Sequence, residues 1–168
     1  DYEFHMFYHV FYNFCVVDLS SFYLDILKDR LYTYPKDSEE RRSGQTALHE
    51  LLVNMTLLMA PILSFTADEI WDYLPEGSAG EASVHLSCFP DFSRKWLDEP
   101  LVRKWDQIVV LKSEASKALE ICRQGKLIGH SLDAAVKLQL PKEMQELLQK
   151  DMEQLKYVFI VSAVENAN

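Results

Sequence analysis

The feature that most constrains the fold of this chain is a stretch of 34 residues at its start that contains neither proline nor glycine. Within this stretch, apolar residues recur at spacings of four and three over about six helical turns: Phe4, Tyr8, Phe11, Cys15, Leu19, Phe22 and Ile26. Such spacing is typical of one face of an α-helix. A helix of about 30 residues would be about 45 Å long, which favours an elongated helical bundle over a compact α/β fold. Asp18, Ser20 and Ser21 leave a break as the alternative.

A second helical pattern follows the turn that begins at Pro35. Ser38, followed by two glutamates, has the character of a helix start. The pattern continues to Leu74, but Pro61 lies inside it and should either kink the helix or occupy the first turn of a new one. Thr66 and Glu69 have the spacing of a capping box. Residues 38–74 are therefore predicted to form one kinked helix or two joined helices.

The rest of the chain changes character twice. Residues 75–100 are rich in proline, glycine and serine and are predicted to be a linker, extended at most over residues 83–86. A third helical stripe runs from Leu101 to Cys122 and should end at Gly125 and Gly129. Apolar residues then alternate over 136–140 as in a strand, a helix of about 14 residues should begin at Pro141, and residues 158–161 suggest a second strand.

These patterns predict a mainly α fold, in which a helical bundle is followed by a small α/β element. The bundle should cover residues 1–124, including the linker 75–100, and the α/β element should cover residues 125–168.

Composition narrows the class of protein. The chain has 26 acidic and 17 basic residues, a net charge of −9, which argues against a free-standing, non-specific nucleic-acid binder. Three cysteines, at spacings that match no zinc or redox motif, indicate reduced thiols and a cytoplasmic protein. No apolar run approaches the roughly 18 residues that span a bilayer, and the start has no signal-peptide pattern.

Three groups of residues could suggest chemistry, and each has a plainer interpretation. His5 and His9 are four residues apart but lack a third metal ligand nearby, which favours ordinary surface or interface histidines. The carboxylates near Asp68 suit complementation of a helix dipole better than acid–base catalysis. Residues 125–131 contain glycines, a lysine and a serine, but not in the order of a phosphate-binding loop. No catalytic or metal site is therefore predicted.

Basic side chains gather near the expected helix ends. The candidates for phosphate contacts are Lys28, Arg30, Arg41, Arg42, Arg123 and Lys126. Arg41 and Arg42 stand out, because the start of a helix disfavours cations. Tyr32 and Tyr34 lie beside the first pair and could stack on unpaired bases.

Several sequence blocks, in order, resemble a known family. They are residues 13–15 (NFC), 18–20 (DLS), 22–25 (FYLD), 28–32 (KDRLY), 41–43 (RRS), 45–46 (QT), 58–71 (LMAPILSFTADEIW), 83–86 (SVHL), 89–90 (FP), 118–120 (ALE) and 128–134 (IGHSLDA). Together they look like the anticodon-binding helical bundle of class I aminoacyl-tRNA synthetases, and the resemblance extends over residues 4–136. Within that class they are most similar to the bacterial-type isoleucyl enzymes.

The resemblance implies a module that holds the anticodon stem and loop of tRNA(Ile) and works with catalytic and editing domains of the same polypeptide. Members of this family activate the amino acid with ATP and Mg²⁺, and some carry a zinc module near the C-terminus. The ATP-site signatures HIGH and KMSKS and the zinc-binding cysteines are absent from these 168 residues. The resemblance therefore transfers no catalytic residue and no cofactor to this chain.

Two other functions remain open at this point. The same module could belong to a valyl or leucyl enzyme, which tRNA charging would distinguish. Alternatively, the bundle could bind another protein and never touch RNA, in which case its association would be insensitive to salt.

Overall fold

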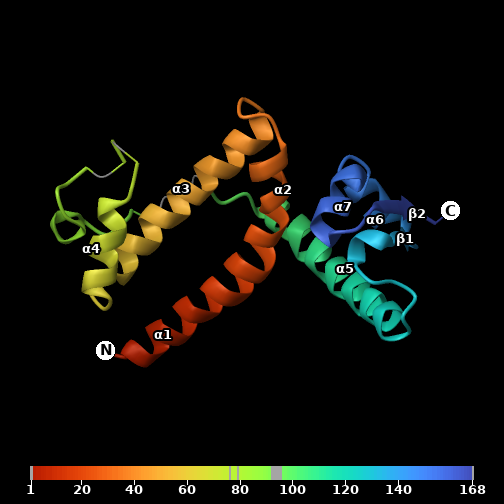
Figure 1. Cartoon of the computed structure of the whole chain (residues 1–168), viewed down its shortest axis with the longest axis horizontal. Helices are drawn as coiled ribbons and strands as arrows, with labels where there is room; N and C mark the ends of the chain where they lie inside the picture. The colour runs from red at the N-terminus through yellow and green to blue at the C-terminus, as the bar shows by residue number, and fades with distance from the viewer. Residues whose placement is uncertain (1, 76, 79, 92–95, 168) are drawn as a thin grey trace. The chain divides into compact units, whose positions relative to one another are not determined.

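The computed structural model describes residues 2–75, 77–78, 80–91 and 96–167. The chain divides into two compact units, residues 1–93 and 94–168. The mainly α fold with a small α/β element is confirmed (Figure 1).

The first unit begins with a helical path of 30 residues, Phe4–Thr33, as the sequence predicts. The path is made of α1 (Phe4–Asn13), the π-helical segment η1 (Phe14–Leu24) and α2 (Asp25–Thr33). In η1 the Ser21 Oγ donates a hydrogen bond to the Val16 carbonyl five residues earlier, at 2.7 Å. The polar residues 18–21 therefore coincide with a wider helix and not with a break.

The apolar stripe predicted for this path is only partly buried. Phe4 and Tyr8 are each 59% exposed, whereas Phe7 and Phe11 pack against the core of the unit. Residues 4–33 also contain an 18-residue window of mean hydropathy 1.4, long and apolar enough to cross a membrane by length and composition alone. The sequence expectation concerned uninterrupted apolar runs, and polar residues such as Asn13 and Asp18 do interrupt this one. A mean over 18 residues tolerates such interruptions, so the helical path passes on average hydropathy although it contains no continuous apolar run of that length.

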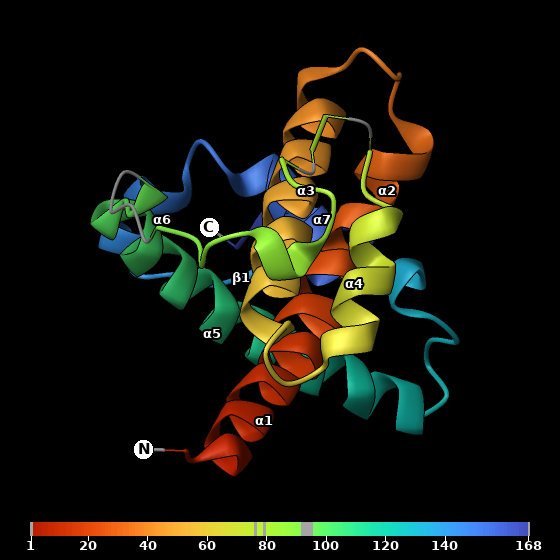
Figure 2. The same ribbon diagram turned by 90° about the vertical axis from the view of Figure 1, so that its left-hand side faces the viewer.

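Helices α3 (Glu39–Met59) and α4 (Ser64–Asp72) form two joined helices on either side of Pro61. Ser38 is the N-cap of α3, as predicted, and its Oγ accepts a hydrogen bond from the Arg41 N–H at 3.3 Å. The predicted cap at Thr66 is wrong, because α4 already begins at Ser64 and has no side-chain cap. The two helices pack against each other (Figure 2).

The segment that follows α4 is more than a linker. Val84, only 2% exposed, joins the core that α3 and α4 form with Trp71. The Trp71 Nε1–H donates to the Glu81 carbonyl at 3.0 Å, and the Ser83 hydroxyl donates to Asp68 at 2.6 Å. Residues 84–86 form a 3-10 turn, η2, instead of the predicted extended segment, because these contacts fold the chain back onto α4.

The second unit begins with α5 (Glu99–Gln124), whose N-cap is Asp98. The sequence predicts this helix and its end at Gly125. The left-handed conformation that glycine favours is nevertheless adopted by Lys126, with φ +56°, while Gly125 keeps φ −72°. Helix α5 packs against α7 within this unit.

The rest of the second unit is a β-α-β arrangement. It consists of the 3-10 turn η4 (Ser131–Asp133), β1 (Ala135–Leu138), α6 (Lys142–Leu148), α7 (Met152–Phe159) and β2 (Ala163–Asn166). The strands are parallel, with Ala135 opposite Ala163 and Leu138 opposite Asn166. The predicted single helix after Pro141 is two shorter helices.

The predicted strand over residues 158–161 is wrong. Val158 and Phe159 continue the buried face of α7 that starts at Leu155, and Ile160 then ends the helix in a left-handed conformation with φ +57°. The second strand lies immediately after this turn.

Candidate nucleic-acid interface

Six of the eight residues predicted to contact nucleic acid lie near one another in the chain, at the end of α2, in the turn that follows it and in the first turn of α3. We call residues 28–42 the α2–α3 corner. Helix α2 ends at Thr33, the chain is extended at Tyr34, and α3 starts after Ser38. The Ser38 N–H donates to the Pro35 carbonyl at 3.0 Å and closes the turn.

Helices α2 and α3 contact each other closely at the base of the corner. Leu27 of α2 is 3% exposed, and it packs where α3 presents Gly44. A Cβ atom at Gly44 would lie 2.7 Å from Leu27 Cδ1, closer than real Cβ contacts come. Glycine therefore leaves the space on α3 that the Leu27 side chain fills, which lets the two helices pack closely at the base of the corner.

The Arg41 side chain makes a hydrogen bond within the corner. Its Nη1 donates a hydrogen bond to the Tyr34 carbonyl at 3.1 Å. This contact accounts for a cation at the start of a helix, where the dipole disfavours it, because the guanidinium satisfies a carbonyl left over from the end of α2.

Lys28 and Arg30 also have neighbours within the chain. The Lys28 ammonium forms an ion pair with Asp25 at 2.7 Å, and this hydrogen bond raises the pKa of the lysine. Arg30 lies near Tyr23, where its charge lowers the pKa of the phenol against the larger effect of burial, which raises it. Both cations remain at the surface of α2, and Lys28 is about half exposed.

Arg42 differs from its neighbour. Among the described residues, its guanidinium has no hydrogen-bond or ion-pair partner, and the side chain is exposed. The same holds for Lys36, an exposed cation in the turn that the sequence analysis did not single out. Tyr32 is 84% exposed on the last turn of α2. These three side chains are the ones free to meet a ligand.

The local charge favours an anion. Residues 28–42 contain five cations and four carboxylates, in a chain whose net charge is −9. The excess is small, but two of the five cations, Lys36 and Arg42, have exposed side chains with neither a carboxylate nor a main-chain partner in the part of the chain that the structure describes. An exposed tyrosine beside unpaired cations is an arrangement that can stack on a base and contact phosphate.

The other two candidates, Arg123 and Lys126, lie in the second unit at the end of α5. Arg123 pairs with Glu120 at 2.7 Å, and Lys126 is exposed. They are therefore not part of the α2–α3 corner.

Residues 125–131, which resemble a phosphate-binding loop in composition, have two main-chain N–H groups bound to a carboxylate of the same chain. The Asp133 carboxylate accepts the N–H groups of Gly129 and His130, at 3.2 and 2.7 Å. These amides are the donors that a phosphate would need, so the loop offers no nucleotide cradle as it stands.

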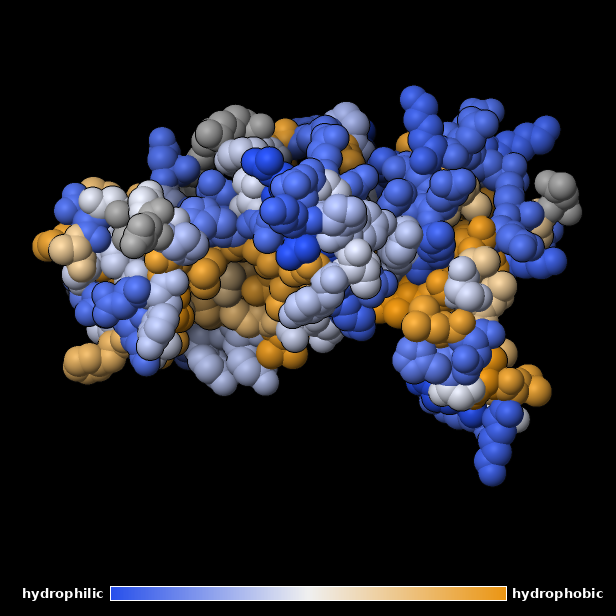
Figure 3. All heavy atoms as spheres, turned by 45° about the horizontal axis from the view of Figure 1, so that its top comes forward, coloured by the Kyte–Doolittle hydropathy of each residue, from blue (hydrophilic) through white to orange (hydrophobic). Residues whose placement is uncertain are grey.

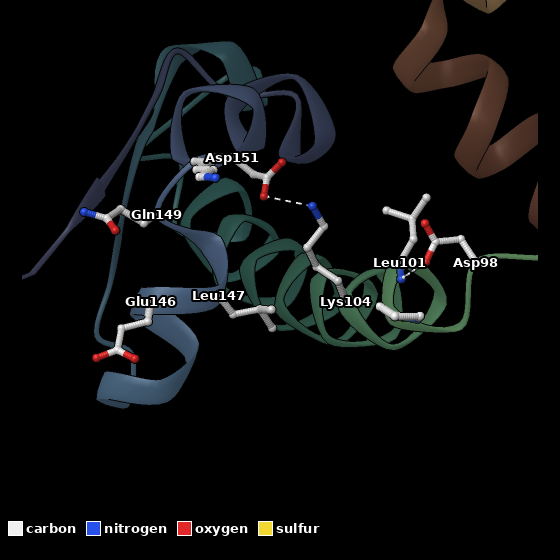
Figure 4. Close-up of a pocket in the computed structure, with 9 residues that line it drawn as sticks. Asp98, Leu101, Lys104, Glu146, Leu147, Gln149 and Asp151 are labelled. Carbon is white, nitrogen blue, oxygen red and sulfur yellow. Dashed lines mark hydrogen bonds and ion pairs between the residues drawn. The ribbon is translucent and has the colours of Figure 1, made fainter.

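A hollow of the second unit is lined by charged side chains whose contacts are structural. It has a volume of about 510 Å³ and lies between the start of α5 and the α6–α7 turn. Figure 4 shows Lys104 paired with Asp151 at 3.0 Å and Asp98 accepting the Leu101 N–H, while Glu146 points away from the ion pair. These contacts join α5 to the start of α7 and cap α5, which is a structural role.

The first unit has apolar hollows instead. One of about 350 Å³ lies between α1 and α3, and its lining includes Phe7, Phe14 and Met55. Figure 3 shows apolar residues gathered around a hollowed area on the half of the molecule that α3 and α4 occupy in Figure 1. Within the described part of the chain, no three His, Cys, Asp or Glu side chains are grouped as metal ligands.

Comparisons with known proteins relate this chain to tRNA ligases. The family described as the anticodon-binding domain of tRNA ligase matches residues 1–138. Isoleucine–tRNA ligase from Geobacter sulfurreducens is 50% identical over 165 residues, and that from Syntrophotalea carbinolica is 52% identical over 166 residues. The enzyme of the same name from Desulfitobacterium hafniense strain DCB-2 is 48% identical over 164 residues. Each alignment covers 98% of this chain but only 18% of the relative.

Proposed function

The chain belongs to the family of anticodon-binding domains of tRNA ligases, and from this premise we propose that it recognises the anticodon stem-loop of tRNA(Ile) within an isoleucine–tRNA ligase. The observation that carries the proposal is identity of about half over almost the whole chain to enzymes of that name. The chain spans about a fifth of their length, so catalysis would reside in other parts of the polypeptide. ATP, Mg²⁺ and any zinc would be bound there, and the enzyme would act in the cytoplasm.

The mechanism proposed for this region is positioning. Contacts to phosphates set the orientation of the stem-loop, and unpaired bases are distinguished by stacking and by hydrogen bonds to their edges. Arg42 is the leading phosphate contact of the original six candidates, because its guanidinium is exposed and unpartnered among the described residues. Tyr32 is the leading stacking residue, because it is the more exposed of the two candidate tyrosines.

The remaining candidates take lesser parts in this proposal. Lys28 and Arg123 would contact phosphate while sharing their charge with Asp25 and Glu120. Arg30 and Lys126 would add positive charge at the ends of α2 and α5. Arg41 and Tyr34 would shape the corner through their mutual hydrogen bond more than contact RNA directly.

The proposal supports a direct binding test. We expect a labelled isoleucine anticodon stem-loop to bind the chain more tightly than a stem-loop with a scrambled loop, measured by fluorescence anisotropy. Binding should weaken as salt rises, because phosphate contacts release counterions. Equal affinity for both loops would contradict recognition by this chain alone.

Charging of purified tRNAs and RNA binding distinguish this proposal from the two alternative functions. A complete ligase that carries this region should charge tRNA(Ile) and leave tRNA(Val) and tRNA(Leu) uncharged. Charging of either of the others would assign the module to a valyl or leucyl enzyme, which the relatives do not favour. A protein-interaction module would show association with a partner but no salt-dependent RNA binding.

A further inference from the structure

The small sheet of the second unit has an open edge along β2. The described residues contribute two strands of four residues each to this sheet. The Ala167 N–H donates to the Leu138 carbonyl at 2.8 Å. In a parallel ladder every second residue faces the partner strand, so Ala163 and Glu165 also face β1. The N–H and C=O groups of Val164 and Asn166 consequently point away from it.

A groove runs beside this edge. It has a volume of about 290 Å³, and its lining comes from α7, through Met152, Glu153 and Lys156, and from the first residues of β2. A strand that paired with β2 could thus form main-chain hydrogen bonds with Val164 and Asn166. It would also pack against the Met152 side chain and the aliphatic part of the Lys156 side chain, which line the groove. Val164 and Asn166, the two residues of β2 whose main-chain groups point outward, are uncharged, and β2 contains no proline. The strand is short, and its one charged side chain, Glu165, is paired with Lys137 of β1 at 3.5 Å.

We propose that the β2 edge accepts a third strand, supplied by a part of the same polypeptide that lies outside these 168 residues. A sheet of two short strands needs a helix packed against it, which here is α7 against β2, and a third strand would add main-chain hydrogen bonds to that support. The relatives are more than five times longer than the stretch they share with this chain, so a donor within the same polypeptide is available. A donor on the same polypeptide also has a high effective concentration, which favours it over a second copy.

Hydrogen exchange tests the assignment residue by residue. In the complete ligase the outward amide of Val164 should exchange at least about tenfold more slowly than in the 168-residue chain. The inward amide of Glu165 should be protected in both, and it serves as the internal control. Fast exchange of Val164 in the ligase would overturn the proposal, as would slow exchange in the short chain that depends on protein concentration and so reveals a second copy.

A pair of proline variants gives an independent test. Asn166→Pro removes an outward N–H from an exposed residue, so it should leave the melting temperature of the 168-residue chain unchanged and lower that of the complete ligase. Glu165→Pro removes a bond to β1 and should lower both. An Asn166→Pro ligase as stable as the unaltered one would refute the third strand.

The proposal rests on the chain being part of a longer ligase, but not on RNA binding. A ligase that charges tRNA(Ile) while Val164 remains unprotected would overturn the third strand alone. A protected edge in an enzyme that charges another tRNA would overturn the proposed specificity alone.

Discussion

The guanidinium of Arg41 donates a hydrogen bond to the carbonyl of Tyr34 seven residues earlier, at 3.1 Å, and so joins the start of α3 to the end of α2. Its neighbour Arg42 projects from the same turn without a hydrogen-bond or ion-pair partner among the described residues. Two adjacent arginines thus have different surroundings, one structural and one exposed, which allows their effects on stability and on RNA binding to be separated.

Replacing these arginines by glutamine should give opposite results. Arg42→Gln should reduce the slope of log affinity against log salt by about 0.7 to 0.9 and change the free energy of unfolding by less than about 0.5 kcal/mol. Arg41→Gln should lower the free energy of unfolding by about 1 kcal/mol, because a carbonyl loses its donor. Anisotropy titrations at several salt concentrations and urea unfolding measure the two effects. An Arg42→Gln protein with an unchanged salt slope would remove this residue from the interface.

Leu27 and Gly44 should be energetically coupled. Leu27→Ala should lower the free energy of unfolding by about 2 to 5 kcal/mol, because it leaves a cavity beneath the corner. Gly44→Ala should be more favourable in the Leu27→Ala protein than in the unaltered one, because the new methyl group no longer meets Leu27 Cδ1. A double-mutant cycle by urea unfolding should give a coupling of about 0.5 to 3 kcal/mol. Additive effects would show that the Leu27 side chain does not fill the space at Gly44.

Tyr23 should make the protein less stable in alkali. Burial raises the pKa of its phenol, with Arg30 opposing the rise, so the folded chain keeps this proton to higher pH than the unfolded chain does. The resulting stability is fully present below the unfolded pKa of about 10 and is lost as pH rises through the folded value. Urea unfolding between about pH 9 and 11 should therefore show a shallower decline for Tyr23→Phe.

Tyr32→Phe is the matched control for that experiment, because it removes the same hydroxyl group from a side chain that is 84% exposed. A decline for Tyr23→Phe as steep as that of the unaltered protein would mean that the Tyr23 phenol does not contribute.

The cysteines should differ in reactivity. Burial raises the pKa of the Cys15 thiol, whereas Cys88 is exposed. Because the thiolate is the reactive form, iodoacetamide at about pH 8 should alkylate Cys88 at least about tenfold faster than Cys15. Mass spectrometry of the labelled peptides gives both rates, and the denatured protein should lose the difference. Preferential labelling of Cys15 in the folded protein would contradict the burial of η1 at that residue.

Helix positions were predictable where a local signal and the apolar period agreed. Ser38 began α3 as expected, and the stripe from Leu101 to Cys122 gave α5. The apolar run 158–161 was misassigned because a short run has no period of its own, and the burial of Val158 and Phe159 beside Leu155 decides in favour of a helix. The 3-10 turn at Val84 depends on Trp71 and Asp68, whose contacts a sequence pattern does not contain.

The candidate site was predictable as a list of residues but not as an arrangement. Charge and position in the sequence pointed to Lys28, Arg41 and Arg42 alike. What distinguishes them is the ion pair of Lys28 and the main-chain hydrogen bond of Arg41, which depend on side-chain geometry that the sequence does not give. Lys36 was missed because a lone lysine after proline carries no signal in the sequence. Its exposure in the same turn distinguishes it only once the fold is known.

The carboxylate of Asp133, bound to the amides of Gly129 and His130, has a consequence for how this loop can evolve. The Asp133 carboxylate is attached to the chain, so it occupies these two N–H groups in preference to an anion from solution. A single substitution that removes this carboxylate would uncover both donors at once, without any new residue having to arise. The main chain at Gly129 and His130 thus depends on one side chain for the acceptor of both amides.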